Sequence, residues 1–194
     1  MTRRFLAGAL LCGAALPASA IELHAGYGHA RVATEPLNML PVLLPPGGAP
    51  AFEREVAVLS GGARFDLFMV VPVSVSAFAS DTAHFQRSYS PGVGLPDIES
   101  AHTLEARGVR IAFAPAIPLG NGWELDGSIG AQYLEQEMTV DLTPTQRFHV
   151  KSSSLGGFAG VGVTWWPLPV LGLRAGVDVA EDYEALTIGL RIGF

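Results

Sequence analysis

The sequence predicts an all-β protein, an eight-stranded antiparallel up-and-down transmembrane β-barrel. The last residues alternate, with Leu186, Ile188, Leu190, Ile192 and Phe194 separated by small or polar residues, and period two places the two sets on opposite faces of a strand. Mean hydropathy is positive at +0.34, yet no apolar run after residue 20 is long enough for a membrane helix. Hydrophobicity without a helical span favours strands, because only helices and closed barrels satisfy their backbone polar groups in lipid.

Residues 1–20 are predicted to be a cleaved signal peptide, and residues 21–194 to form one barrel domain. Arg3 and Arg4 provide a positive start, residues 5–15 an apolar core, and Ala18, Ser19 and Ala20 a cleavage site. The apolar core is shorter than the roughly 20 residues of a membrane-spanning helix. We therefore expect Sec-type export and a mature chain without cysteine, since Cys12 lies inside the signal peptide.

Eight segments show the alternation at the length of tilted membrane-spanning strands, about 9 to 11 residues. They cover about residues 21–31, 56–69, 72–80, 104–115, 121–134, 154–166, 169–180 and 184–194. The first follows the cleavage site, and the second is the least regular. The turn at Gly120, Asn121 and Gly122 joins the fourth and fifth into the clearest hairpin. The outward sets of the first seven are Leu23, Ala25 and Tyr27; Ala63, Phe65 and Leu67; Val73, Val75, Ala77 and Ala79; Val109, Ile111 and Phe113; Trp123, Leu125, Ile129, Ala131 and Tyr133; Leu155, Ala159, Val161, Val163 and Trp165; Leu171, Leu173, Ala175 and Val177.

Connection lengths give a second indication of a barrel. Turns near Val71, Leu119 and Leu168 are short, whereas segments 32–55, 81–103 and 135–153 are predicted to be long loops. Outer-membrane barrels pair short periplasmic turns with longer extracellular loops, so both termini are expected in the periplasm. A soluble β-sandwich is the alternative fold, but it would explain neither this rhythm nor the terminal Phe194.

The pattern resembles the small eight-stranded outer-membrane proteins, the group of the OmpA membrane domain and the OmpX and Ail type surface proteins. The resemblance covers residues 21–194 and rests on the closing strand and on the turn at Trp165, Trp166 and Pro167. It implies a location in the bacterial outer membrane, contact with its lipid and lipopolysaccharide, and insertion by the barrel-assembly machinery. It also implies that Leu190, Ile192 and Phe194 form the assembly signal. Tyr27, Trp123, Tyr133, Trp165 and Trp166 are predicted to anchor the barrel at the membrane interfaces.

Strand alternation turns a nearly balanced set of charges into the lumen. Because an eight-stranded barrel is just wide enough for its interior side chains, we expect these charges to pair as a polar plug. A narrow channel for ions or small solutes is the alternative interpretation. The predicted lumen network consists of Glu22, Arg64, Asp66, Arg110, Glu124, Asp126, Arg174, Asp178 and Arg191.

No catalytic or metal-binding residue is predicted, and no cofactor. Ser100 and His102, with Glu99 and Glu105 nearby, would suit a lipid-modifying hydrolase or acyltransferase, but strand alternation would turn both inward, away from lipid. The histidines His84, His102 and His149 lack the spacing of a metal site, and His29 is expected to be a polar rim residue. Enzymatic activity is therefore a minor alternative.

The expected role is structural or surface interaction, such as adhesion or envelope integrity, through the extracellular loops. Segment 32–55 contains an apolar proline-rich stretch at residues 40–46, and exposed apolar stretches often mark interaction surfaces. Without Arg3 and Arg4 the chain has 10 basic and 18 acidic residues, a net charge of −8 with neutral histidines. That balance argues against nucleic acid as a partner. We expect a monomer.

Overall fold

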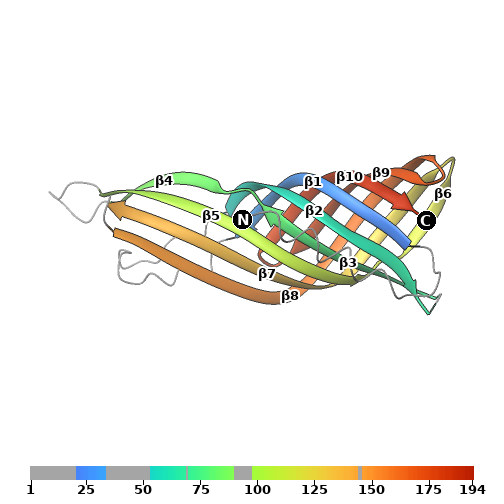
Figure 1. Ribbon diagram of the computed structural model, residues 1–194, viewed down its shortest axis with the longest axis horizontal. Coiled ribbons are helices and arrows are strands. Elements are labelled where there is room, and N and C mark those ends of the chain that lie inside the picture. Colours follow the sequence, from blue (N-terminus) through green and yellow to red (C-terminus); the bar gives the residue numbers. More distant parts are fainter. Residues whose placement is uncertain (1–20, 34–52, 69, 90–97, 144–145) are drawn as a thin grey trace.

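The computed structural model is a closed barrel that continues at one end into a tall open sheet (Figure 1). It describes residues 21–33, 53–68, 70–89, 98–143 and 146–194. The predicted signal peptide and most of the predicted loop 32–55 lie outside these residues. No helix among them is long and apolar enough to cross a membrane. The strands are β1 (Ile21–Ala33), β2 (Glu53–Leu67), β3 (Val71–Ser80), β4 (Ala83–Tyr89), β5 (Ile98–Phe113), β6 (Ala116–Gly120), β7 (Trp123–Thr143), β8 (Gln146–Leu168), β9 (Leu171–Ala180) and β10 (Tyr183–Gly193).

The hydrogen-bonded ring runs β1–β2–β3–β5–β7–β8–β9–β10 and closes by pairing of β10 with β1, always antiparallel. This confirms the predicted eight-stranded antiparallel barrel. β4 and β6 add no further position to the ring, because each continues a neighbour. β4 follows β3 along β5, and β6 follows β5 along β7.

Two local irregularities separate these continued strands. Ala79 pairs with Arg107 and Ala83 with Leu104, so β3 and β4 carry one more residue than β5 between these two pairs, which is a β-bulge. Asp81 fastens the bulge to β2, since its amide donates to the Ala57 carbonyl and its carboxylate accepts from the Ala57 amide. Pro115, which has no amide hydrogen, follows β5 and separates it from β6.

The prediction of long loops at 81–103 and 135–153 is wrong. Instead, β5 begins at Ile98 and pairs with β4, while β7 and β8 continue to Thr143 and Gln146. These hairpins rise beyond the ring at what we call the hairpin end (left in Figure 1). The opposite end, which we call the turn end, carries the β2/β3, β6/β7 and β8/β9 turns and the junction of β1 with β10.

The core lies inside the barrel, in the half nearest the hairpin end. There most inward residues are apolar, not polar as the sequence pattern predicted for the lumen. The apolar set changes face along a strand: on β1, Leu23 and Tyr27 are exposed outside, while Ala30 and Val32 are buried inside. This buried cluster, which we call the apolar plug, comprises Ala30, Val32, Val56, Val58, Phe78, Ala106, Leu134, Tyr183 and Ala185.

Candidate functional site

Arg191 of β10 is the centre of an ion-pair cluster in the lumen near the turn end. Its Nη1 lies 2.9 Å from Glu124 Oε1 of β7, and its Nη2 lies 3.4 Å from Glu22 Oε2 of β1. Nη1 also donates to Thr164 Oγ1 at 2.9 Å, and the Thr164 hydroxyl donates to Asp126 at 3.2 Å. The guanidinium of Arg191 therefore links four strands of the barrel, namely β1, β7, β8 and β10.

Two further arginines complete this cluster. Arg64 Nη1 of β2 lies 3.3 Å from Glu22 and 3.5 Å from Glu124. Arg174 Nη2 of β9 lies 2.8 Å from Asp126 Oδ1. Each carboxylate thus has at least one cationic partner, which offsets the cost of holding charge in a poorly hydrated lumen.

Arg110 of β5 forms a separate pair closer to the apolar plug. Its Nη1 donates to Asp178 Oδ2 at 2.7 Å, and its Nε donates to Gln132 Oε1 at 2.6 Å. The rings of Phe78, Phe158 and Tyr183 lie 4.6, 5.1 and 4.7 Å from the guanidinium carbon. Such cation–π contacts stabilise a cation more strongly where water is excluded.

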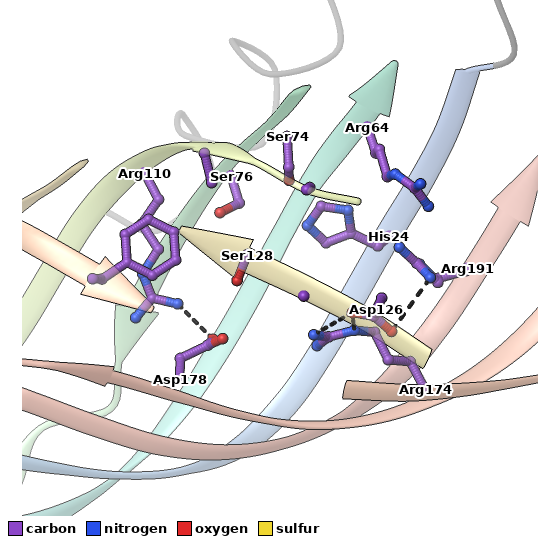
Figure 2. A pocket seen from close by; sticks show the side chains of 14 residues that line it. His24, Arg64, Ser74, Ser76, Arg110, Asp126, Ser128, Arg174, Asp178 and Arg191 are labelled. Carbon is purple, nitrogen blue, oxygen red and sulfur yellow. Dashed lines mark hydrogen bonds and ion pairs between the residues drawn. The ribbon is translucent and has the colours of Figure 1, made fainter. Parts of the chain in front are cut away.

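A polar cavity of about 70 Å³ lies between the two groups of charges. Figure 2 shows Arg110 and Asp178 on one side and Asp126, Arg174 and Arg191 on the other. Its lining also includes His24, Ser74, Ser76 and Ser128. A space of this size and polarity suits a few ordered waters.

The structure brings eight of the nine predicted network residues into ion pairs. Asp66 is the exception: it lies opposite Pro72 near the β2/β3 turn and forms no ion pair within the described residues. The eight paired residues are Glu22, Arg64, Arg110, Glu124, Asp126, Arg174, Asp178 and Arg191.

The apolar plug closes the lumen above the charges. Val32 is fully buried and Val58 and Leu134 nearly so. An ion crossing this layer would lose its hydration and meet mainly apolar side chains, which is costly. Among the described residues, the lumen is therefore largely filled by side chains and contains a small polar cavity.

Polar side chains pair across the β7/β8 hairpin on the outer face of the projecting sheet. His149 Nε2 and Lys151 Nζ lie 2.7 and 2.9 Å from the two Glu137 oxygens, and Arg147 Nε lies 2.6 Å from Asp141. The hydrogen bond from Lys151 lowers the pKa of the Glu137 carboxyl, and that from Arg147 lowers the pKa of Asp141. These pairs were not predicted, because their segments were expected to be loops.

β8 has a long unpaired edge in the projecting sheet. Residues 158–168 of β8 lie beside β9, but residues 146–157 pair, within the described part of the chain, with β7 alone. An edge of this kind presents backbone amides and carbonyls that another strand can bind. The projecting sheet β4–β5–β7–β8 is therefore the candidate interaction site.

The predicted alternative catalytic and metal residues do not converge. His102 is buried on the inner face and stacks on Phe85, with ring centroids 4.9 Å apart, whereas His84 is exposed. The Ser100 and Glu99 side chains lie outside what the structure describes. His149 contacts Thr139 Oγ1 at 3.1 Å as well as Glu137, a hydroxyl–imidazole–carboxylate series. All three stand on an open sheet face, where water competes for each contact.

The outward residues form an apolar belt bounded by aromatic side chains. Trp123 and Trp165 stack with centroids 6.1 Å apart near the turn end, and Tyr27 and Tyr133 are exposed towards the hairpin end. Tyr133 follows Trp123 by ten positions along β7. At about 3.3 Å per residue and a tilt of about 40°, that distance spans about 25 Å, the height of a membrane-barrel belt.

Trp166 does not belong to this belt, contrary to prediction. It alternates with the outward Trp165, and its ring covers the inward side of Gly172 and Gly193, where an added Cβ would lie 3.0 and 3.8 Å from ring atoms. It therefore fills the lumen mouth instead of facing an interface. Leu190, Ile192 and Phe194 all lie exposed on the outer surface, as strand alternation requires.

No family model and no curated protein sequence matches the chain. Solved structures do. OprG from Pseudomonas aeruginosa is 12% identical, with 91% of this chain and 96% of OprG covered and a TM-score of 0.58. A major outer membrane protein from Thermus thermophilus is 17% identical, with 92% and 100% covered and a TM-score of 0.52. Ail, the attachment invasion locus protein of Yersinia pestis, is 16% identical, with 91% and 99% covered and a TM-score of 0.44.

Identities this low establish the fold alone. At that level they confirm the predicted resemblance: the chain has the fold of the small outer-membrane β-barrels. Fold does not fix a role within this group, so the role must be argued from the sites of this chain.

Proposed function

We propose that this chain is a bacterial outer-membrane barrel that mediates surface interaction through the projecting sheet β4–β5–β7–β8. The turn end faces the periplasm and the hairpin end faces outward, in keeping with short periplasmic turns and longer external connections. The apolar belt, about 25 Å high by the strand geometry above, supports this placement. Export by a signal peptide and insertion by the barrel-assembly machinery through Leu190, Ile192 and Phe194 are part of the proposal.

The observation that carries the proposed role is the edge of β8 at residues 146–157, which pairs with β7 alone among the described residues. An extended segment of a partner can add to such an edge, so that main-chain hydrogen bonds supply affinity and neighbouring side chains supply specificity. The edge carries Lys151 and three serines, which discourage indiscriminate pairing between copies of the chain. Segment 32–55, predicted to bind a surface ligand, lies mostly outside the described residues and stays a second candidate for this role.

The lumen supports this role over the channel alternative. The apolar plug lies between the charged cavity and the hairpin end, which argues against a continuous polar path through the described part of the barrel. The paired charges then stabilise the barrel as a rigid base for the sheet. An enzymatic role has weaker support still, because His102 is buried in stacking contact with Phe85.

Whole-cell adhesion tests the role. Cells that express the full chain are compared with cells that express a shortened hairpin, in which residues 137–151 are replaced by Asn-Gly. Binding of both kinds of cells is measured on a panel of immobilised extracellular proteins. We expect adhesion of the full chain to at least one surface and its loss in the shortened variant, with both barrels folded on a heat-modifiability gel. Equal adhesion of both variants, or no adhesion of the full chain to any surface, would contradict the proposal.

Membrane placement has its own test. The full chain and a version lacking Phe194 are compared in outer-membrane fractions on the same kind of gel. A faster-migrating unheated band for the full chain, lost without Phe194, is expected from a barrel whose last residue is read during assembly. A periplasmic protein without a heat shift would refute the membrane location.

A further inference from the structure

The connections at the turn end are uncharged and largely apolar. The segments 67–73, 113–123 and 165–173 contain no Asp, Glu, Lys or Arg. Their tips are nonetheless open to the surroundings: Phe68 is 85% exposed, Val70 79%, Leu119 59% and Val170 57%. The fourth junction at this end, between β10 and β1, carries Phe194, which is 77% exposed. Isolated exposed apolar residues are ordinary, but four adjoining sites without a charge form a patch that needs an explanation.

The hairpin end shows the opposite composition. Immediately beyond the belt, outward positions become charged, with Asp81 after β3, Glu135 on β7, Glu181 after β9 and Glu184 on β10. The outward ion pair between Arg107 and Glu135 crosses from β5 to β7 at the same level. The apolar belt therefore ends at charged outward residues on the side of the hairpin end. On the side of the turn end, apolar residues continue to the tips of the turns.

Phe68 is held in a backbone conformation that disfavours it. Its φ is +53°, in the left-handed region where glycine or asparagine is the usual residue. The β6/β7 turn follows that preference, with Asn121 at φ +54°. A bulky exposed residue at such a position suggests that its side chain is required for something other than local folding.

The apolar turns are continuous with the belt. In the ladder, Ile117 of β6 lies opposite Leu125, and Leu168 lies opposite Leu171, so each turn extends an outward row. The stacked pair Trp123 and Trp165 lies between these two turns. The four sites also occupy all four junctions around the barrel, as a surrounding medium requires and a partner docked on one side does not.

We propose that Phe68, Val70, Leu119, Leu168, Val170 and Phe194 form an apolar collar that embeds in the headgroup region of the inner phospholipid leaflet. The turns of this barrel then end within lipid instead of in periplasmic water. Charges hold the hairpin end at the outer surface, while the collar holds the turn end in the inner leaflet. The inference rests on the proposed membrane location and adds the lipid that the turns contact.

Site-directed spin labelling tests the collar, because Cys12 is the chain's one cysteine and lies in the predicted signal peptide. Single-cysteine variants F68C, L119C and V170C are labelled in phosphatidylethanolamine–phosphatidylglycerol vesicles. Collisions with lipid-soluble oxygen and with a water-soluble nickel chelate are measured for each. I129C in the belt and E181C at the hairpin end are the lipid and water controls, and only variants with a heat-shifted band are compared.

We expect the oxygen-to-nickel ratio at the three collar positions to exceed that of E181C several-fold and to lie between it and that of I129C, which is deeper in the belt. Ratios equal to that of E181C, with I129C still in lipid, would overturn the collar and leave the barrel in the membrane; the turns would then be a surface for a periplasmic protein. A water-like ratio at I129C would instead refute the membrane location, and the collar with it.

Discussion

The pair of Arg110 and Asp178 should be one of the most strongly coupled pairs in the barrel. The atoms Nη1 and Oδ2 lie 2.7 Å apart, and the two side chains are 8% and 13% exposed. At an effective dielectric constant of about 20, charges about 4 Å apart attract by about 4 kcal/mol. Removing one partner leaves the other charge without compensation, and such changes cost about 3 to 5 kcal/mol.

Arg110→Met, Asp178→Asn and the double variant form the test, measured by urea unfolding in phospholipid vesicles with tryptophan fluorescence. We expect each single variant to lower the free energy of unfolding by about 3 to 5 kcal/mol. The double variant should lose about 2 to 3 kcal/mol less than the sum of the two, because the second substitution removes a charge that is already unpaired.

An exposed ion pair of similar length is the control that separates the effect of burial from the effect of distance. Arg147 and Asp141 are as close, at 2.6 Å, but 73% and 35% exposed on the hairpin. Exposed pairs contribute little in water, so Arg147→Met should leave unfolding unchanged within error. Additive effects at Arg110 and Asp178, or equal losses at the buried and exposed pairs, would refute the view that burial makes the lumen pair strong.

Three further predictions concern packing, conduction and pH. Gly130→Ala should abolish the heat-shifted band, because its Cβ would lie 2.0 Å from a backbone carbonyl oxygen, whereas Gly156→Ala meets nothing within 4 Å and should fold normally. Planar-bilayer current should be the same for the wild type and for Arg110→Ala combined with Arg174→Ala, because the apolar plug stays in place; a clear rise would restore the channel interpretation. The pKa of Glu137 is lowered in the folded hairpin, so its stabilisation of the hairpin is complete above about pH 4.5 and is lost as pH falls through the lowered pKa. Amide hydrogen exchange in the hairpin should therefore become faster at acid pH, and Glu137→Gln should remove this acceleration.

Much of the barrel follows from alternation within single strands. The outward rows are apolar, as on β10, so period two identifies both the strand and its face. Alternation also assigned the charges to the lumen. It could not assign their partners, because pairs such as Arg110 with Asp178 cross the barrel between β5 and β9, and their meeting depends on register and tilt.

The hairpin end was missed for a different reason. Period two continues past the belt, but the apolar set changes sides: on β7, Ile129 and Tyr133 face outward, whereas Leu134 and Val140 are buried inside. If the outward face is expected to stay apolar, the charged residues Glu135 and Glu137 on that face predict that the strand ends there. A shift of the apolar set from odd to even positions, without loss of alternation, is the signal that could have found these hairpins.

The apolar residues change from the outer to the inner face along strands such as β1 and β7. This change divides the same strands into two parts that are stable in different surroundings. Towards the turn end, the outer surface is apolar and the interior charged, as in barrels whose outside is covered by lipid. Towards the hairpin end, the interior is apolar and the outer face polar, as in a water-soluble sheet, so this part gains hydrophobic stabilisation without lipid. The apolar plug lies at this transition and packs residues of β1, β2, β3, β5, β7 and β10 together. The projecting sheet is therefore joined to the barrel by a largely apolar core, and the β8 edge that pairs with β7 alone among the described residues stands on this packed base.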